Sequence, residues 1–124
     1  MIAADTSSFV EYFQGGKDPS ALAVDVAIRN GTLCLPAVVV TELISDKKAG
    51  AVIEPLVAAL PRLDPTDGFW ARAGRARRQL LAHGLKARLG DTLAAQACID
   101  YNVPLIARDK DFRHFVKHCG LVLA

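Results

Sequence analysis

The sequence predicts one α/β domain built around a central, mostly parallel β-sheet. Short apolar runs typical of buried strands alternate with amphipathic helical segments along all 124 residues. No linker, internal repeat or low-complexity segment interrupts this alternation, so we expect residues 1–124 to form a single domain. Hydrophobic residues make up 52% of the chain, which is enough material for one core.

The first strand and helix are predicted at the N-terminus. The apolar run Met1–Ala4 is short enough for a buried strand and ends at Asp5. Hydroxyl side chains at Thr6–Ser8 can cap the helix that follows, and Gly15-Gly16 end it. Asp5 therefore stands at the carboxyl end of a strand.

A second helix, a strand and a third helix follow. Ser20 is a candidate cap for a helix that ends at Asn30-Gly31. Leu33–Leu35 is predicted as a buried strand, and the next helix begins at about Val38, with Glu42 in its first turns. The side chains predicted to face inward from that helix are Val39, Leu43 and Ile44.

The middle of the chain is predominantly helical. Ala51–Leu60 predicts a helix, and Arg62–Asp64 predicts a short edge strand. Thr66 or Asp67 can cap a long helix from about Phe69 to Leu81.

The last third predicts another strand, helix and acidic residue in sequence. Asp91 is placed where an N-cap residue belongs, before the helix Thr92–Tyr101. Pro104–Ala107 predicts a buried strand, with Asp109 just beyond its carboxyl end, and Leu121–Leu123 predicts a final strand.

Charge and composition exclude some classes of protein. The longest apolar stretch is far below the ~18 residues of a membrane span, and the N-terminus lacks a signal-peptide pattern, so we expect a cytoplasmic protein with no membrane segment. The three cysteines show no metal-ligand spacing and are expected to be buried thiols. The net charge of +2 is uninformative, but a basic run is present, and it suits either a polyanion beside an acidic pocket or a solvated helix face. Its members are Arg72, Arg75, Arg77, Arg78, Lys86 and Arg88.

Four separated acids are the candidate site: Asp5, Glu42, Asp91 and Asp109. In an open parallel sheet, ligands bind beyond the carboxyl ends of the strands, where these acids are predicted to converge. Carboxylates brought together repel one another unless a hard cation such as Mg²⁺ or Mn²⁺ lies between them. Taken singly, each aspartate is equally explained as a cap or turn residue, whereas Glu42 lies among apolar neighbours that leave it little solvated surface.

The combined pattern resembles a known family. The segments Ile2–Ser8, Pro36–Leu43, Gly84–Ala97 and Val103–Phe112 are similar, in order and spacing, to the four motifs of PIN-domain ribonucleases, and more narrowly to the VapC toxins of toxin–antitoxin pairs. The resemblance implies a PIN-like three-layer α/β/α fold. It also implies an endoribonuclease that hydrolyses RNA phosphodiesters with a metal-activated water.

The resemblance assigns roles to particular residues. It makes Asp5, Glu42, Asp91 and Asp109 the catalytic residues that bind Mg²⁺ or Mn²⁺, and it gives Thr6 or Ser7 a supporting hydroxyl. The family usually has a threonine or serine two residues before the fourth acid, where this chain has Ala107. Candidate contacts to RNA phosphates are Lys86, Arg88 and Arg108.

Partners and alternatives follow from the same resemblance. It implies an RNA substrate, a cognate antitoxin that blocks the site, and a homodimer. The helices 22–28 and 51–60 offer apolar surfaces for dimerisation, and the same stripes would equally serve as core or as an antitoxin groove. The main alternative is a catalytically weakened PIN-like module that binds RNA or protein. A receiver-type phosphoacceptor domain fits less well, because Asp5 lacks an adjacent acid and Glu42 lies in a predicted helix.

Overall fold

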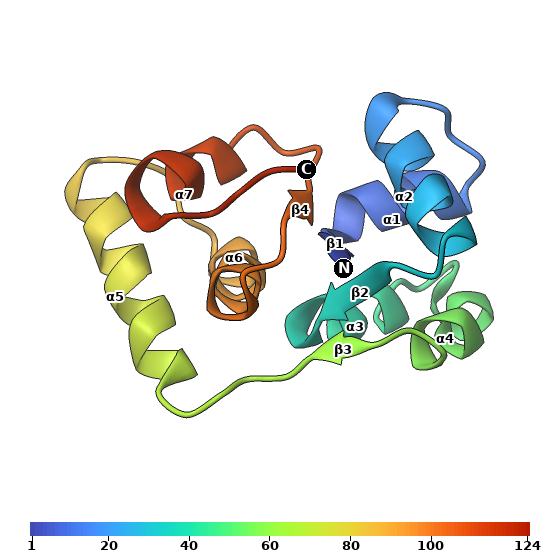
Figure 1. The fold of residues 1–124 in the computed structure, drawn as a ribbon, viewed down its shortest axis with the longest axis horizontal. Helices are drawn as coiled ribbons and strands as arrows, with labels where there is room; N and C mark the ends of the chain where they lie inside the picture. The colour runs from blue at the N-terminus through green and yellow to red at the C-terminus, as the bar shows by residue number, and fades with distance from the viewer.

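A computed structural model describes residues 1–124 and contains a four-stranded sheet between two groups of helices. In chain order the elements are β1 (Ile2–Ala4), α1 (Thr6–Phe13), α2 (Pro19–Arg29), β2 (Leu33–Pro36), α3 (Ala37–Ile44), α4 (Gly50–Ala58), β3 (Arg62–Leu63), α5 (Phe69–Ala82), α6 (Leu89–Tyr101), β4 (Leu105–Ile106) and α7 (Phe112–Cys119). Figure 1 shows α5, α6 and α7 on one side of the strands and α1 to α4 on the other. The predicted three-layer α/β/α architecture is confirmed.

The sheet has the strand order β3-β2-β1-β4, and every pairing is parallel. The order therefore changes direction between β1 and β4, whose residues Ala3 and Ala4 pair with Leu105 and Ile106. Binding sites in such sheets lie at this reversal, beyond the carboxyl ends of the strands. Asp5 and Asp109 follow those two ends in the sequence.

Alternation along the strands divides the core in two. Ala3 and Cys34 belong to the cluster under α5, α6 and α7, whereas Ala4 and Leu35 belong to the cluster under α1 to α4. Successive strand residues point to opposite faces, so a sheet covered on both sides needs apolar residues at every position. Strands β1, β2 and β4 are accordingly continuous apolar runs, whereas the edge strand β3 begins with the exposed Arg62.

Several helix starts differ from those predicted. Asp18, not Ser20, caps α2, because Pro19 occupies the first helical position and Asp18 accepts the backbone N–H of Ala21 at 2.8 Å. Helix α5 begins after Gly68, whose backbone is in the left-handed conformation with φ of 80°. No side chain caps this helix.

Two other predictions for the apolar residues are also changed. Ile44 was predicted to face inward, but it is 38% exposed, while Val39 and Leu43 are buried. The predicted strand at 121–123 is reduced to one bridge, between Leu123 and Leu105.

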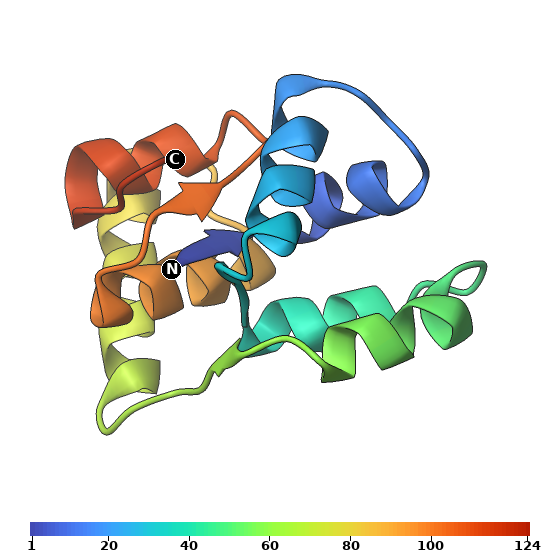
Figure 2. The same cartoon turned by 45° about the vertical axis from the view of Figure 1, so that its right-hand side comes forward.

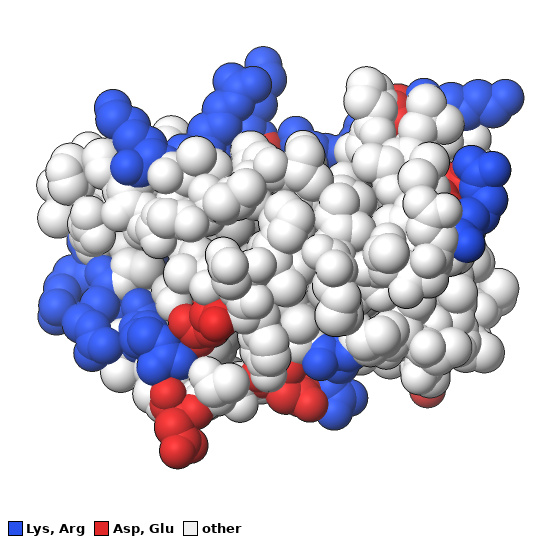
Figure 3. All heavy atoms as spheres, viewed as in Figure 1, with Lys and Arg blue, Asp and Glu red and all other residues white.

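Members of the basic run have different partners in the structure. Arg72 forms an ion pair with Asp100 at 2.7 Å, and Arg77 donates to the carbonyl of Ala87. Figure 3 shows one group of Lys and Arg side chains at the left, over the end of the molecule that carries α5 in the same view, and others along the top and the right edge. No residue of α5 lines the acidic groove described below, so the solvated-face interpretation of the α5 arginines is the better one.

Candidate active site

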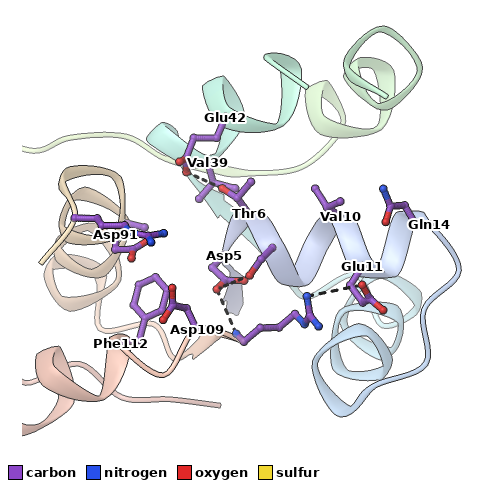
Figure 4. Close-up of a pocket in the computed structure, with 14 residues that line it drawn as sticks. Asp5, Thr6, Val10, Glu11, Gln14, Val39, Glu42, Asp91, Asp109 and Phe112 are labelled. Atoms are coloured by element: carbon purple, nitrogen blue, oxygen red, sulfur yellow. Dashed lines mark hydrogen bonds and ion pairs between the residues drawn. The ribbon is translucent and has the colours of Figure 1, made fainter. Parts of the chain in front are cut away.

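All four predicted acids line one groove at the carboxyl ends of the strands. The groove has a volume of about 370 Å³ and lies between α1, α3, the start of α6 and the loop that precedes α7. Figure 2 shows α3 and α4 side by side at the lower right, below α1 and α2. In Figure 4 the carboxylates of Asp5, Glu42, Asp91 and Asp109 surround one hollow, each delivered by a different segment.

Asp5 both caps a helix and faces the groove. One oxygen accepts the backbone N–H of Ser8 at 2.8 Å, and the other accepts the Ser7 hydroxyl and the backbone N–H of Arg108, each at 3.3 Å. The residue is only 4% exposed. Burial raises the pKa of Asp5, and these hydrogen bonds partly oppose that rise. The capping role and the site role predicted for Asp5 are therefore compatible.

Asp91 lies in the first turn of α6 and is not its cap, which corrects the sequence prediction. The helix begins at Leu89, because the carbonyl of Arg88 accepts both the N–H and the hydroxyl of Thr92, at 2.9 and 2.8 Å. A carboxylate in a first turn is favoured by the helix dipole.

The carboxylate of Asp91 has one oxygen without a partner. Its Oδ2 is the one buried side-chain nitrogen or oxygen in the molecule that makes no hydrogen bond. Burial and, after it, the negative charges of Asp109, Glu42 and Asp5 together raise the pKa of Asp91 to about 6, against the opposing charge of Arg88. Buried polar atoms normally have a partner, so this oxygen marks a place for an additional ligand.

Glu42 is held at the rim of the groove. Its Oε1 accepts the hydroxyl of Thr6 at 2.6 Å, so Thr6 contacts this acid whereas Ser7 contacts Asp5. Its Oε2 lies against Gly90, where an added Cβ would approach it to 3.0 Å. Contrary to expectation, Glu42 is exposed, because α3 buries Val39 and Leu43 and turns Glu42 toward the groove.

Asp109 occupies the loop after β4. Its Oδ1 accepts the backbone N–H of Asp111 at 2.8 Å, which closes a tight turn before α7. Asp111 itself faces Lys86 and His114, each at 3.8 Å, and does not line the groove. Ala107 also lies outside the groove, in a neighbouring hollow with Ser7 and Asp18.

The three candidate phosphate contacts differ in their surroundings. Arg88 and Arg108 line the groove, whereas Lys86 does not. Arg88 forms no ion pair or side-chain hydrogen bond, while Arg108 is engaged by Asp18 and Glu11.

The donor set fits a hard divalent cation. All four groups are carboxylates, the ligands that Mg²⁺ and Mn²⁺ prefer, and Asp91 contributes an oxygen that no protein donor satisfies. As they stand, no three of these side chains form a complete cation cluster. A cation would therefore be held with water completing its shell, as is usual for Mg²⁺.

Sequence reasoning missed several residues that shape the groove. Ser8 is fully buried and donates to the carbonyl of Ile106 at 3.4 Å, which ties α1 to the end of β4. Gly90 makes room for Glu42, and its position beside Asp91 was the available signal. Val10 and Gln14 face the groove one and two turns after Thr6, a spacing that α-helical periodicity indicates.

Comparisons with known proteins show which family the chain is similar to. The PIN domain family model matches residues 2–117. The chain is 31% identical over 121 residues to a VapC ribonuclease of Mycobacterium bovis and to ribonuclease VapC11 of Mycobacterium tuberculosis, covering 90% of this chain and 89% of each relative.

Solved structures show the same fold. VapBC2 from Rickettsia felis, bound to a DNA fragment from its promoter, matches with a TM-score of 0.77 and 21% identity, over 100% of this chain and 98% of that one. FitAcB from Neisseria gonorrhoeae matches with a TM-score of 0.72 and 18% identity, over 100% and 97%. The chain belongs to the PIN-domain family and, within it, to the VapC ribonucleases.

Proposed function

We propose that this protein is a Mg²⁺- or Mn²⁺-dependent endoribonuclease that acts as the toxin of a toxin–antitoxin pair. The observation that carries the metal dependence is the unpartnered Oδ2 of Asp91 in a groove shared with Asp5, Glu42 and Asp109. Family membership supports the choice of RNA as substrate. We expect the protein to act in the cytoplasm, where that substrate is found.

The four acids would contribute to cation binding in different ways. Asp5 and Asp91 have raised pKa values, mainly because they are buried, and Asp109 exerts the largest repulsion on Asp91, so a positive charge among these carboxylates offsets both effects. Thr6 and Gly90 fix the two oxygens of Glu42, and the turn at Asp111 fixes Asp109. A bound Mg²⁺ or Mn²⁺ activates water for attack on the phosphodiester and neutralises charge on the phosphate.

The test is cleavage of a single-stranded RNA by the parent protein and by Asp5→Asn and Asp91→Asn, at equal metal concentrations. We expect both variants to lose activity, because each removes a ligand charge while keeping the side-chain volume. Asp25→Asn is the control, since Asp25 pairs with Arg29 on the surface of α2, outside the groove. Full activity in either site variant would reject the proposed site, and RNA binding without cleavage by the parent would favour the weakened binding module.

We also propose an antitoxin partner that covers the acidic groove with a basic or aromatic side chain. The negative potential and open rim of the groove suit a cationic group from the partner. Co-expression with the neighbouring upstream open reading frame tests this, and the expected result is relief of growth arrest. Arrest that no neighbouring gene product relieves would count against it.

A homodimer is the remaining part of the proposal. Leu22 and Val26 of α2 are 51% and 48% exposed, and Val52 of α4 is 68% exposed, so both predicted helices offer apolar surface. Sedimentation of the purified protein tests the prediction, because a monomer at micromolar concentration would contradict it.

A further inference from the structure

Two arginines line the acidic groove, and the protein gives them different surroundings. Arg108 follows β4 and stands beside Asp109, while Arg88 precedes α6 and lies three residues before Asp91. Both could serve as cations for a nucleic-acid phosphate. The two arginines differ in the residues with which their side chains interact.

Arg108 is bonded at both its main chain and its side chain. Its backbone N–H donates to Oδ2 of Asp5 at 3.3 Å. Its Nε donates to Oδ2 of Asp18 at 2.7 Å, and its Nη1 lies 3.8 Å from a carboxylate oxygen of Glu11. The dashed lines in Figure 4 mark the contacts to Asp5 and Glu11. The residue therefore links the loop of Asp109 to α1 and to the start of α2.

The partners of Arg108 are themselves fixed. Oδ1 of Asp18 accepts the N–H of Ala21 and the hydroxyl of Ser20, both at 2.8 Å, so only its Oδ2 is left for the guanidinium. Glu11 is folded against the turn after α1, where a Cβ at Gly16 would come within 2.6 Å of its side chain. The carboxylates of Asp18 and Glu11 therefore both interact with the guanidinium of Arg108.

Arg88 has no such partners. It forms no ion pair and no side-chain hydrogen bond, although its charge acts on Asp91. Lys86, the other nearby cation, lies outside the groove and faces Asp111 at 3.8 Å. Arg88 is therefore the groove cation whose hydrogen-bond donors remain free for a ligand.

We propose that the two arginines divide their roles: Arg108 is a positioning residue that braces Asp5 and the Asp109 loop, and Arg88 contacts the phosphate of the RNA substrate. The proposal rests on the ribonuclease function proposed above. It predicts that breaking the Arg108 brace impairs the turnover rate, while removing Arg88 impairs RNA binding.

Asp18→Asn breaks the brace selectively. Asparagine is an equally good N-cap, so its carbonyl oxygen keeps the bonds that start α2, while its amide group replaces the oxygen that accepts from Arg108. If Arg108 instead contacted phosphate, this change would release the guanidinium and remove a negative charge, and RNA binding would tighten. The two roles therefore predict opposite results. Asp25→Asn, which breaks a surface ion pair of the same helix, is the matched control.

The experiment measures cleavage kinetics and metal-free RNA binding for the parent and five variants: Asp18→Asn, Arg108→Gln, the double variant of these two, Arg88→Gln and the control Asp25→Asn. For Asp18→Asn and Arg108→Gln we expect kcat to fall about fivefold, as for loss of one partly exposed ion pair, with KM unchanged. The Mg²⁺ concentration for half-maximal cleavage should rise, which a smaller folded fraction would not cause. The double variant should lose no more than either single variant, because both break one contact.

Binding of a single-stranded oligonucleotide in EDTA supplies the readout that is independent of catalysis. Arg88→Gln should weaken binding and reduce the slope of log affinity against log salt by about 1. Asp18→Asn and Arg108→Gln should leave affinity and slope unchanged. Tighter binding by Asp18→Asn, or a reduced salt slope in Arg108→Gln but not in Arg88→Gln, would overturn the division of roles. A parent that cuts no RNA would reject the proposed function, whereas these binding comparisons would still decide between the two arginines.

Discussion

Asp91→Asn should stabilise the metal-free protein while abolishing its activity. Asp91 is forced to ionise in a partly buried groove beside three other acids, and its pKa rises from an ordinary 3.8 to about 6. That difference of about 2.2, at about 1.36 kcal/mol for each pKa unit, makes about 3 kcal/mol the upper bound on what ionisation of Asp91 costs the folded state above pH 6, since solvent screens this half-buried group. Asparagine has nearly the same shape and no charge, so it removes most of that cost.

The sign of the effect depends on pH in a specific way. Because the pKa of Asp91 is higher in the folded than in the unfolded chain, the parent loses stability as pH rises from about 4 to about 6. Urea unfolding in EDTA should therefore show Asp91→Asn more stable than the parent by up to about 3 kcal/mol at pH 7.5, with little of this gain left near pH 4. Asp25→Asn should show no such gain. A variant that is less stable than the parent at pH 7.5 would refute the reasoning.

Three further results are expected. Thr6→Val removes the 2.6 Å bond to Glu42 and should lower kcat about tenfold, the loss of one hydrogen bond to a charged group; unchanged kinetics would contradict that role. Gly90→Ala should impair cleavage, because its Cβ would crowd Glu42, whereas Gly74→Ala, with open space around it in α5, should keep activity and raise stability by up to about 1 kcal/mol. Mg²⁺ at 100 times its Kd should raise the free energy of unfolding of the parent by about 2.7 kcal/mol, and by much less in Asp91→Asn; equal gains in thermal or urea melts would place the cation elsewhere.

The architecture was predictable because it depends on local patterns. The apolar runs at Ile2–Ala4 and Leu33–Pro36 are strands because a sheet covered on both faces needs apolar residues throughout, and their ends place Asp5 at the rim. Helix starts were less predictable, because several capping residues compete near each one. At α2 the deciding signal was Pro19, which favours the first helical position and so assigns the cap to Asp18.

The details of the site depend on contacts between distant residues. The exposure of Glu42 follows from the way α3 packs, and the engagement of Arg108 follows from a turn that brings Asp18 to it from 90 residues away. No sequence pattern encodes such pairings. Periodicity could, however, have placed Val10 and Gln14 on the face of α1 that carries Thr6.

The central claim is that the four converging acids form one cation site that cuts RNA. The most direct measurement follows Mn²⁺ occupancy by electron paramagnetic resonance and RNA cleavage in the same titration, for the parent and for Asp91→Asn. We predict that the parent cuts RNA in proportion to bound Mn²⁺ and stops when EDTA removes it, and that Asp91→Asn neither binds the ion at these concentrations nor cuts. Cleavage that persists in EDTA, or equal Mn²⁺ binding by the variant, would contradict the claim.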